Sequence, residues 1–99
     1  MNMQAMLKQA QNLQKDMLKT KGEIDNTDFH GESSLVKITM KGTKEVTKVE
    51  IDAKDGLDSD DIEMLEDMIL VAFKDAAKKV DADKEKKLGK YGQGLAGLM

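Results

Sequence analysis

The sequence predicts an α+β fold, in which an N-terminal helix, a small antiparallel sheet of about three strands and a long C-terminal helix follow one another. Three observations predict it. Apolar residues repeat with a helical period near the start, alternate with polar residues in the middle, and form a dense run between an acidic and a basic end after residue 57. The chain of 99 residues is long enough for one core, so we expect residues 1–99 to form a single domain.

Residues 3–21 are predicted to form the first helix. No glycine or proline interrupts this segment before Gly22, where we expect the helix to stop. Methionine fills irregular gaps between packed side chains, so the methionines are expected to serve the core. The apolar residues follow one another at spacings of three and four, the heptad spacing of one helix face: Met3, Met6, Ala10, Leu13 and Met17.

Two strands are expected in the middle of the chain. Apolar and polar residues alternate over residues 35–41, and residues 45–52 form a second strand with a similar pattern. Val46 falls out of phase with the other apolar residues of this strand, which indicates either a β-bulge or a second contact surface. Residues 41–44, at the end of the first strand, are expected to form a tight turn, in which Gly42 is able to take a positive φ. Two strands alone would be marginal; a third strand before Gly31, or strand pairing across a dimer, would complete the sheet.

The stretch from Asp58 to about Lys87 is predicted to form the long helix. Its acidic start and lysine-rich end complement the helix macrodipole. Asp60, followed three residues later by Glu63, is close to a capping box. The apolar pattern fades at residues 81–83, where we expect a break or a bend.

The apolar residues of this helix cover more than one stripe, which a small sheet can hardly cover alone. A second copy of the chain is the obvious candidate for the remaining contact. From residue 89 onward the chain contains four glycines, and we expect residues 89–99 to form a flexible tail. Four residues of the helix are expected to be buried, in part by the second copy: Leu65, Ile69, Ala72 and Ala76.

Charge is segregated along the chain, although the net charge is only −3. Residues 1–24 sum to +2, residues 25–73 to −8 and residues 74–99 to +3, an asymmetry that bears on binding partners. All sixteen basic residues are lysines, which bind phosphate as point charges, whereas arginine supplies the fork that reads guanine. A nucleic-acid role would therefore use backbone contacts with little sequence readout. The candidate phosphate contacts, chosen by position and charge, are Lys8, Lys15, Lys19, Lys21, Lys74, Lys78, Lys79, Lys84, Lys86 and Lys87.

Residues suited to catalysis or metal binding are sparse. The chain has no cysteine and one histidine, His30, which we expect to be exposed at a turn. The acidic loop around Gly56 does not fit a calcium-binding EF-hand, because loop positions one, three and twelve are Ile51, Ala53 and Ile62. We therefore expect no enzyme, no metal or other cofactor and no small-molecule substrate.

The sequence also lacks the patterns of secretion and membrane insertion. Lysines interrupt the opening residues, and no apolar run approaches the roughly 20 residues of a membrane span. We expect a cytoplasmic protein that does not engage a membrane.

Several segments that together span nearly the whole chain follow the order of a known family. They are MQAMLKQAQNLQ at residues 3–14, VKITMKG at residues 36–42 with residues 46–52, LEDMILVAFKDA at residues 65–76 and GLAGLM at residues 94–99. Together they resemble the YbaB/EbfC family of bacterial nucleoid-associated proteins, although Ala96 stands where the family usually has proline. The resemblance implies a tweezer-shaped homodimer with a small antiparallel sheet at its centre and protruding helices that contact DNA.

We therefore expect a nucleoid-associated protein that binds double-stranded DNA as a homodimer with little sequence specificity. It would be located at the nucleoid in the cytoplasm and contribute to nucleoid organisation and gene regulation. The alternative is a protein-interaction scaffold that acts through its methionine-rich helices or its C-terminal tail.

Overall fold

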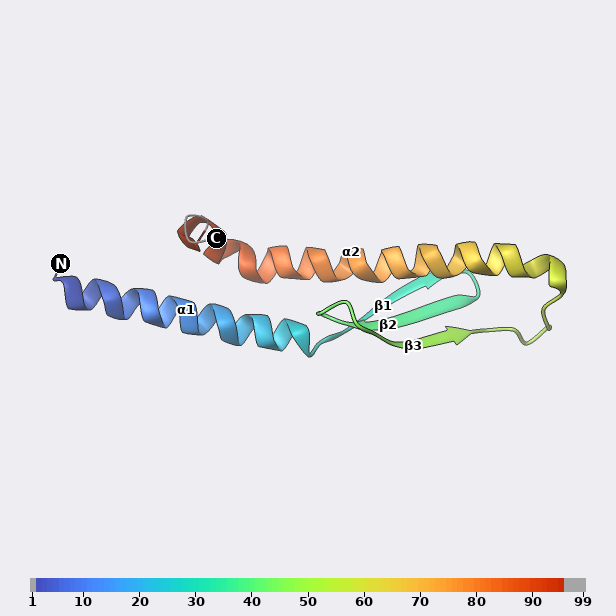
Figure 1. The fold of residues 1–99 in the computed structure, drawn as a ribbon, viewed down its shortest axis with the longest axis horizontal. Helices are drawn as coiled ribbons and strands as arrows, with labels where there is room; N and C mark the ends of the chain where they lie inside the picture. The colour runs from blue at the N-terminus through green and yellow to red at the C-terminus, as the bar shows by residue number, and fades with distance from the viewer. Residues whose placement is uncertain (1, 96–99) are drawn as a thin grey trace.

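The structure is a computed structural model that describes residues 2–95, with the side chains of residues 2–91. Its elements are α1 (Met3–Asp25), β1 (Asp28–Ser33), β2 (Val36–Lys41), β3 (Val46–Ile51), a 3-10 turn (Ser59–Asp61) and α2 (Ile62–Leu95). The predicted α+β order of helix, antiparallel sheet and helix is confirmed. The molecule is elongated, with extents of 71 × 20 × 16 Å, because α2 runs over the sheet and continues in the same direction beside α1 (Figure 1).

α1 continues past the predicted stop. At its start, the side chain of Asn2 accepts a hydrogen bond from the backbone N–H of Ala5 at 2.8 Å. The helix passes through Gly22, which a helix interior tolerates at a cost of about 1 kcal/mol. It ends at Asn26 instead, whose backbone N–H and side-chain amide both donate to the carbonyl of Gly22, at 3.2 and 3.0 Å. The prediction that Gly22 ends the helix is therefore wrong.

The sheet has the order β1-β2-β3, and both strand pairs are antiparallel. A third strand, which the sequence offered as one way to complete the sheet and placed before Gly31, is present as β1, but it includes Gly31 and continues to Ser33. Val36, Ile38 and Met40 of the central strand are buried on one face, as their alternation predicts. The register shifts between Thr39 and Met40, so that Met40 pairs with Val46, and the predicted β-bulge is confirmed.

Two glycines allow the backbones of neighbouring elements to approach closely. A Cβ on Gly31 would lie 2.1 Å from the carbonyl oxygen of Ala72, and a Cβ on Gly42 would lie 2.0 Å from that of Ile24. Gly42 does not adopt the positive φ that glycine allows, whereas Lys44 in the same turn does, at 71°. Gly42 is required by the packing of the turn against the end of α1, which a local sequence pattern does not reveal.

α2 begins later and ends later than its sequence pattern predicts. The carboxylate of Asp61 accepts a hydrogen bond from the N–H of Asp58 at 2.9 Å, so the capping pair precedes the predicted pair of Asp60 and Glu63. The helix is continuous through residues 81–83 and reaches Leu95, so the predicted break is absent. Of the predicted flexible tail, residues 89–95 are helical and residues 96–99 lie outside the described residues.

The polar residues at the predicted break form ion pairs while the helix continues through them. Asp81 lies 2.9 Å from the ammonium of Lys44 in the β2–β3 turn, and Asp83 lies 3.2 Å from that of Lys87 one turn along α2. Tyr91 is also buried, which places an apolar anchor beyond the region where the sequence pattern fades.

The core lies between α2 and the first two strands. The prediction that the methionines of α1 serve the core is wrong for Met3 and Met6, which are exposed because they lie on the part of the chain beyond the sheet. Ala72 and Ala76 are fully buried against β2, as predicted. Leu65 and Ile69 pack against the same core but are only half-buried, because α2 covers β1 and β2 and leaves β3 uncovered. The uncovered strand is the feature of the fold that bears most on assembly.

Candidate nucleic-acid interface

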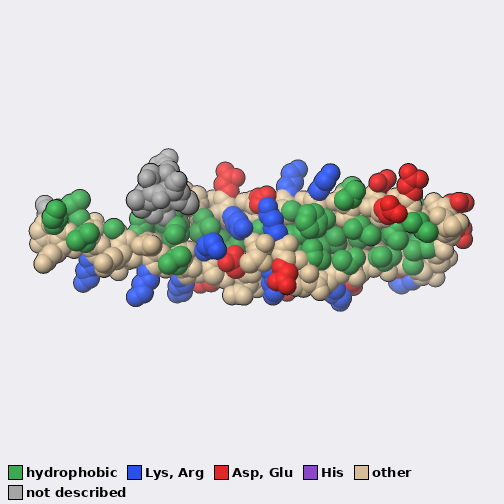
Figure 2. Space-filling model, viewed as in Figure 1, with side chains coloured by type: hydrophobic (Ala, Val, Ile, Leu, Met, Phe, Trp, Pro, Cys, Tyr) green, Lys and Arg blue, Asp and Glu red, His purple; other side chains and the backbone are tan. Residues whose placement is uncertain are grey.

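Three exposed lysines form a row on α1. Lys8, Lys15 and Lys19 are separated by seven and four positions, a spacing that places them on one helix face. Eleven residues at the helical rise make this row about 16 Å long. Figure 2 shows lysine side chains along the edge of α1 that faces away from α2. This row therefore projects into solvent from the arm of the molecule.

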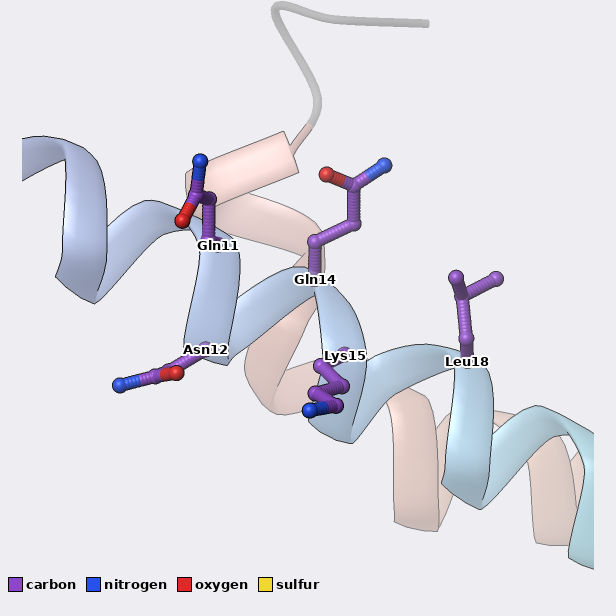
Figure 3. A pocket seen from close by; sticks show the side chains of 5 residues that line it. All are labelled: Gln11, Asn12, Gln14, Lys15 and Leu18. Carbon is purple, nitrogen blue, oxygen red and sulfur yellow. The ribbon is translucent and has the colours of Figure 1, made fainter.

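Three amide side chains lie near Lys15 on α1, and one of them, Asn12, points to the same side as this lysine (Figure 3). A shallow hollow on α1 is lined by Gln11, Asn12, Gln14, Lys15 and Leu18. Figure 3 shows Gln11, Gln14 and Leu18 pointing to one side of the helix and Asn12 and Lys15 to the other. An amide both donates and accepts hydrogen bonds, so Asn12 can accompany Lys15 in contacts with phosphate. The hollow has no nucleophile or carboxylate and is unsuited to catalysis.

α2 carries the second group of predicted lysines. Lys74 and Lys78 are exposed and lie one turn apart on the face opposite the buried Ala72 and Ala76. Lys86 is exposed further along the helix, and Lys84 is half-buried. These residues lie within the helix rather than in its last turn, since α2 reaches Leu95. Their proposed role therefore rests on surface position and not on the helix macrodipole.

The lysines of the sheet and its turn are neutralised by carboxylates. Asp28 is the clearest example, because the hydrogen bond from Lys41, followed by the charge of that lysine, holds the pKa of Asp28 below its ordinary value. The four pairs are Lys37 with Glu32 at 3.8 Å, Lys41 with Asp28 at 2.8 Å, Lys44 with Asp81 at 2.9 Å and Lys48 with Glu50 at 3.4 Å.

Most of the ten lysines predicted to contact phosphate form no ion pair among residues 2–91, unlike the lysines of the sheet. Three hold carboxylates one turn away on their own helix: Lys21 with Asp25 at 3.2 Å, Lys79 with Asp75 at 3.5 Å and Lys87 with Asp83 at 3.2 Å. We call a lysine open when no ion pair involves it among residues 2–91. The open members of the predicted set are Lys8, Lys15, Lys19, Lys74, Lys78, Lys84 and Lys86.

The structure adds one candidate phosphate contact, Lys90, and shows that another, Lys79, makes a structural contact with the sheet. Lys90 is exposed and open, and its ammonium lies 5.1 Å from the ring centroid of Tyr91. Its position in the expected flexible tail hid it from sequence reasoning. Lys79, by contrast, also donates a hydrogen bond to the carbonyl of His30 at 2.8 Å, so its ammonium is held against the sheet.

The single histidine is exposed as predicted, but it lies within β1 and not at a turn. The Nδ1 atom of His30 is 3.1 Å from the hydroxyl of Thr39 on the neighbouring strand. Across the described residues, no group of three His, Cys, Asp or Glu side chains is placed to hold a metal ion. Nor is any helix in that part of the chain long and apolar enough to cross a membrane.

The open lysines of this small α+β chain lie on its two helices, a distribution that suits contact with a polyanion. The chain belongs to the YbaB/EbfC DNA-binding family, whose pattern matches residues 1–95. This is a family of nucleoid-associated DNA-binding proteins and not of enzymes. The resemblance noted in the sequence is thereby confirmed.

Individual proteins show the same likeness. A nucleoid-associated protein of Ligilactobacillus salivarius (strain UCC118) is 38% identical over 99 residues, which cover 99% of this chain and 95% of that protein. Nucleoid-associated protein LL0120 of Lactococcus lactis subsp. lactis (strain IL1403) is 43% identical over 96 residues, covering 96% and 97%. The crystal structure of uncharacterized protein HP0035 from Helicobacter pylori has the same fold, with a TM-score of 0.70, 17% identity and coverage of 87% and 91%.

Proposed function

We propose that this chain is a cytoplasmic, nucleoid-associated protein that binds duplex DNA as a homodimer with little sequence specificity. Through this binding it contributes to nucleoid organisation and gene regulation. The observation that carries the proposal is the division of the lysines. Those of the sheet are paired with carboxylates, while those of the helices are mostly open. An open ammonium can attract a phosphate without first giving up a carboxylate, and membership of a DNA-binding family supports duplex DNA as the source of phosphate.

Low sequence specificity follows from the side chains available. Arginine reads guanine through a rigid two-donor fork, and this chain has no arginine. The lysine ammonium is a mobile point charge that tracks the DNA backbone. Contacts to phosphate position a protein on the duplex but carry no direct sequence information.

The homodimer is supported by an uncovered apolar surface on β3. Val46, Val49 and Ile51 are 38%, 47% and 42% exposed. Val49 pairs with Ile38 and Ile51 pairs with Val36, so these side chains lie on the same face of the sheet as the core. Since α2 does not reach this strand, a second copy of the chain is suited to cover it.

One flank of α2 extends this apolar surface. Asp75 contacts the backbone of β1, so the opposite flank of the helix faces the β3 side. That flank carries Ile62 and Phe73, which are 54% and 39% exposed, together with the half-buried Ile69. In Figure 2 hydrophobic side chains form one continuous area over α2 and the sheet. A surface of this extent is typical of an interface.

The edge of β3 is suited to pair with its own copy. Asp52 donates its N–H inward to the carbonyl of Leu35 at 2.8 Å. Because alternate residues of an antiparallel strand point their backbone groups to opposite sides, the N–H and C=O of Val49 point outward. Two β3 strands paired antiparallel about Val49 would bring Lys48 opposite Glu50 of the partner subunit, once on each side of the two-fold axis.

Charge reversal tests this register. Lys48→Glu places two like charges opposite each other across the proposed interface and should weaken the dimer, as should Glu50→Lys. The double variant Lys48→Glu/Glu50→Lys restores opposite charges and should recover the dimer in sedimentation equilibrium. A double variant no better than the single variants would contradict the register.

Fluorescence anisotropy with random-sequence duplexes tests DNA binding itself. Affinity should be similar for different sequences and should fall with salt, with a slope of about 0.9 in log K against log salt for each phosphate contact. Binding that is insensitive to salt, or no binding at low salt, would contradict the proposed function.

One observation favours the alternative of a protein-interaction scaffold. Met3, Met6 and Leu7 near the tip of α1 are 79%, 54% and 61% exposed. Substituting all three by serine should leave DNA affinity unchanged under the proposed function. If the protein fails to bind DNA and loses a specific protein partner on this substitution, the scaffold is the better account.

A further inference from the structure

The outer edge of β1 is occupied by side chains of α2. The backbone N–H of Glu32 donates to the carboxylate of Asp75 at 3.1 Å, and the ammonium of Lys79 donates to the carbonyl of His30 at 2.8 Å. Asp75 and Lys79 also form an ion pair at 3.5 Å. One side chain thus satisfies an edge donor, and the other satisfies an edge acceptor.

These two backbone groups are the ones that a further strand would use. Residues 30 and 32 are separated by two positions, so both direct their backbone groups away from β2. Gly31 lies between them, and its lack of a side chain lets the helix sit close. A Cβ on Gly31 would lie 2.1 Å from the oxygen of Ala72 and 2.5 Å from the nitrogen of Ala76. The helix is therefore fixed where its charged residues reach the edge.

The other edge of the sheet has no such protection in the described part of the chain. No side chain of residues 2–91 hydrogen-bonds to the outward N–H or C=O of Val49 or Ile51. Exposed strand edges are templates for pairing with another chain, and charged residues are a common means of blocking them. The two edges of this sheet are therefore treated differently.

We propose that Asp75 and Lys79 form an edge cap that closes β1 to strand pairing, so that assembly through β3 stops at two chains. The proposal rests on the homodimer described above. A dimer joined through β3 still has two β1 edges, one at each end of its combined sheet. If those edges were free, dimers could join end to end into open chains instead of a closed two-fold assembly.

Removing the cap tests this inference. Asp75→Ala/Lys79→Ala should produce species larger than a dimer in size-exclusion chromatography with light scattering, with a mass at least about twice that of the dimer and rising with concentration. The matched control is Asp67→Ala/Lys78→Ala, which removes the same two residue types from the outward face of α2. That control should remain a dimer.

A second substitution shows which edge is responsible. Glu32→Pro in the uncapped variant removes the outward N–H that a neighbouring strand would need, and proline is tolerated at such edge positions. It should return the assembly to a dimer. Persistent large species would show that aggregation arises elsewhere and would overturn the edge cap.

Milder variants cover the case in which the double variant does not fold. Lys79→Met keeps the aliphatic stem and frees only the carbonyl of His30, while Asp75→Leu frees only the N–H of Glu32. Each should raise the mass by a smaller factor than the double variant. Folded single variants that both stay dimers would overturn the cap. A monomeric wild-type protein would instead contradict the homodimer, and the cap would still be supported if the uncapped variant self-associated.

Discussion

The lysines of the sheet are paired with carboxylates, whereas most lysines of the helices are not. Within the sheet and its turn, each lysine meets a carboxylate on a neighbouring strand, on its own strand or on α2. On the helices, seven of the ten predicted lysines are open, with Lys90 in addition. The number of lysines therefore says little about a binding surface unless the positions of the neighbouring carboxylates are also known.

The charge segregation of the sequence explains this difference. Residues 25–73 sum to −8, so a lysine in the sheet has carboxylates on several sides. The row on α1 lies in a segment of net positive charge. Exposed ion pairs contribute little to stability, but they engage the lysines of the sheet and leave the open lysines on the helices.

The largest expected effect comes from neutralising each group of lysines in turn. Replacing Lys8, Lys15, Lys19 and Lys78 by glutamine should lower DNA affinity on the order of 10³-fold at low salt, since a dimer loses two copies of each contact. Replacing the four sheet lysines by glutamine changes the net charge equally and should alter affinity far less. Anisotropy titrations of both variants at several salt concentrations measure the contrast. Equal losses in the two variants would indicate that net charge alone governs binding.

A second prediction concerns β3, through which the two chains of the proposed homodimer are joined. Val49→Pro removes an outward N–H without breaking the ladder to β2, so it should yield folded monomers. Because each monomer keeps only one set of lysines, DNA affinity should fall by about 10²-fold, at the lower end of the range for loss of bivalency. Val49→Thr keeps the N–H and serves as the control. A dimeric Val49→Pro variant with full affinity would refute pairing through this edge.

A third prediction compares two glycines. Gly31 lies where α2 packs on β1, and Gly22 lies where α1 has free space around it. Gly31→Ala forces a Cβ against the backbone of α2 and should destabilise the protein by about 1–3 kcal/mol. Gly22→Ala, in the interior of α1, meets nothing within 4 Å and should stabilise it by about 0.5–1 kcal/mol. Urea unfolding followed by circular dichroism measures both changes. Equal effects at the two positions would contradict the close packing of α2 on β1.

The smallest expected effect is the acid dependence of the sheet contacts. The hydrogen bond from the backbone N–H of Glu32 lowers the pKa of Asp75, and the contact with Lys41 lowers the pKa of Asp28, from an ordinary value of 3.8. A lowered folded-state pKa contributes stability above the ordinary value that is lost as the pH falls through the lower one. The melting temperature should therefore decline below about pH 4. Asp28→Asn and Asp75→Asn should each flatten this decline, and an unchanged profile would exclude these contacts as its source.

Local patterns in the sequence predict much of this fold. The heptad spacing of α1 and the alternation of β2 are repeated signals, and the phase of Val46 marks the bulge. The errors arise where a distant element decides the outcome. Gly22 does not end α1, because the end of the helix packs against the β2–β3 turn, with Ile24 buried against Gly42.

The candidate site shows the same division. Position along the helices was enough to select Lys8, Lys15 and Lys19, because helical spacing alone places them on one face. The role of Lys79 was not predictable in this way, since its partner on β1, the carbonyl of His30, lies 49 residues away in sequence. Sorting open lysines from engaged ones requires the strand order and the position of α2 over the sheet.

Chemical-shift mapping by nuclear magnetic resonance tests the central claim most directly. Backbone amide signals are followed while a short random-sequence duplex is added to the isotope-labelled protein. The shifts should concentrate on the outward face of α1 and around Lys74 and Lys78 on α2, and should leave β1 and β2 nearly unchanged. Shifts concentrated on the strands, with the helical lysines unaffected, would contradict the assignment of DNA binding to the helical arms.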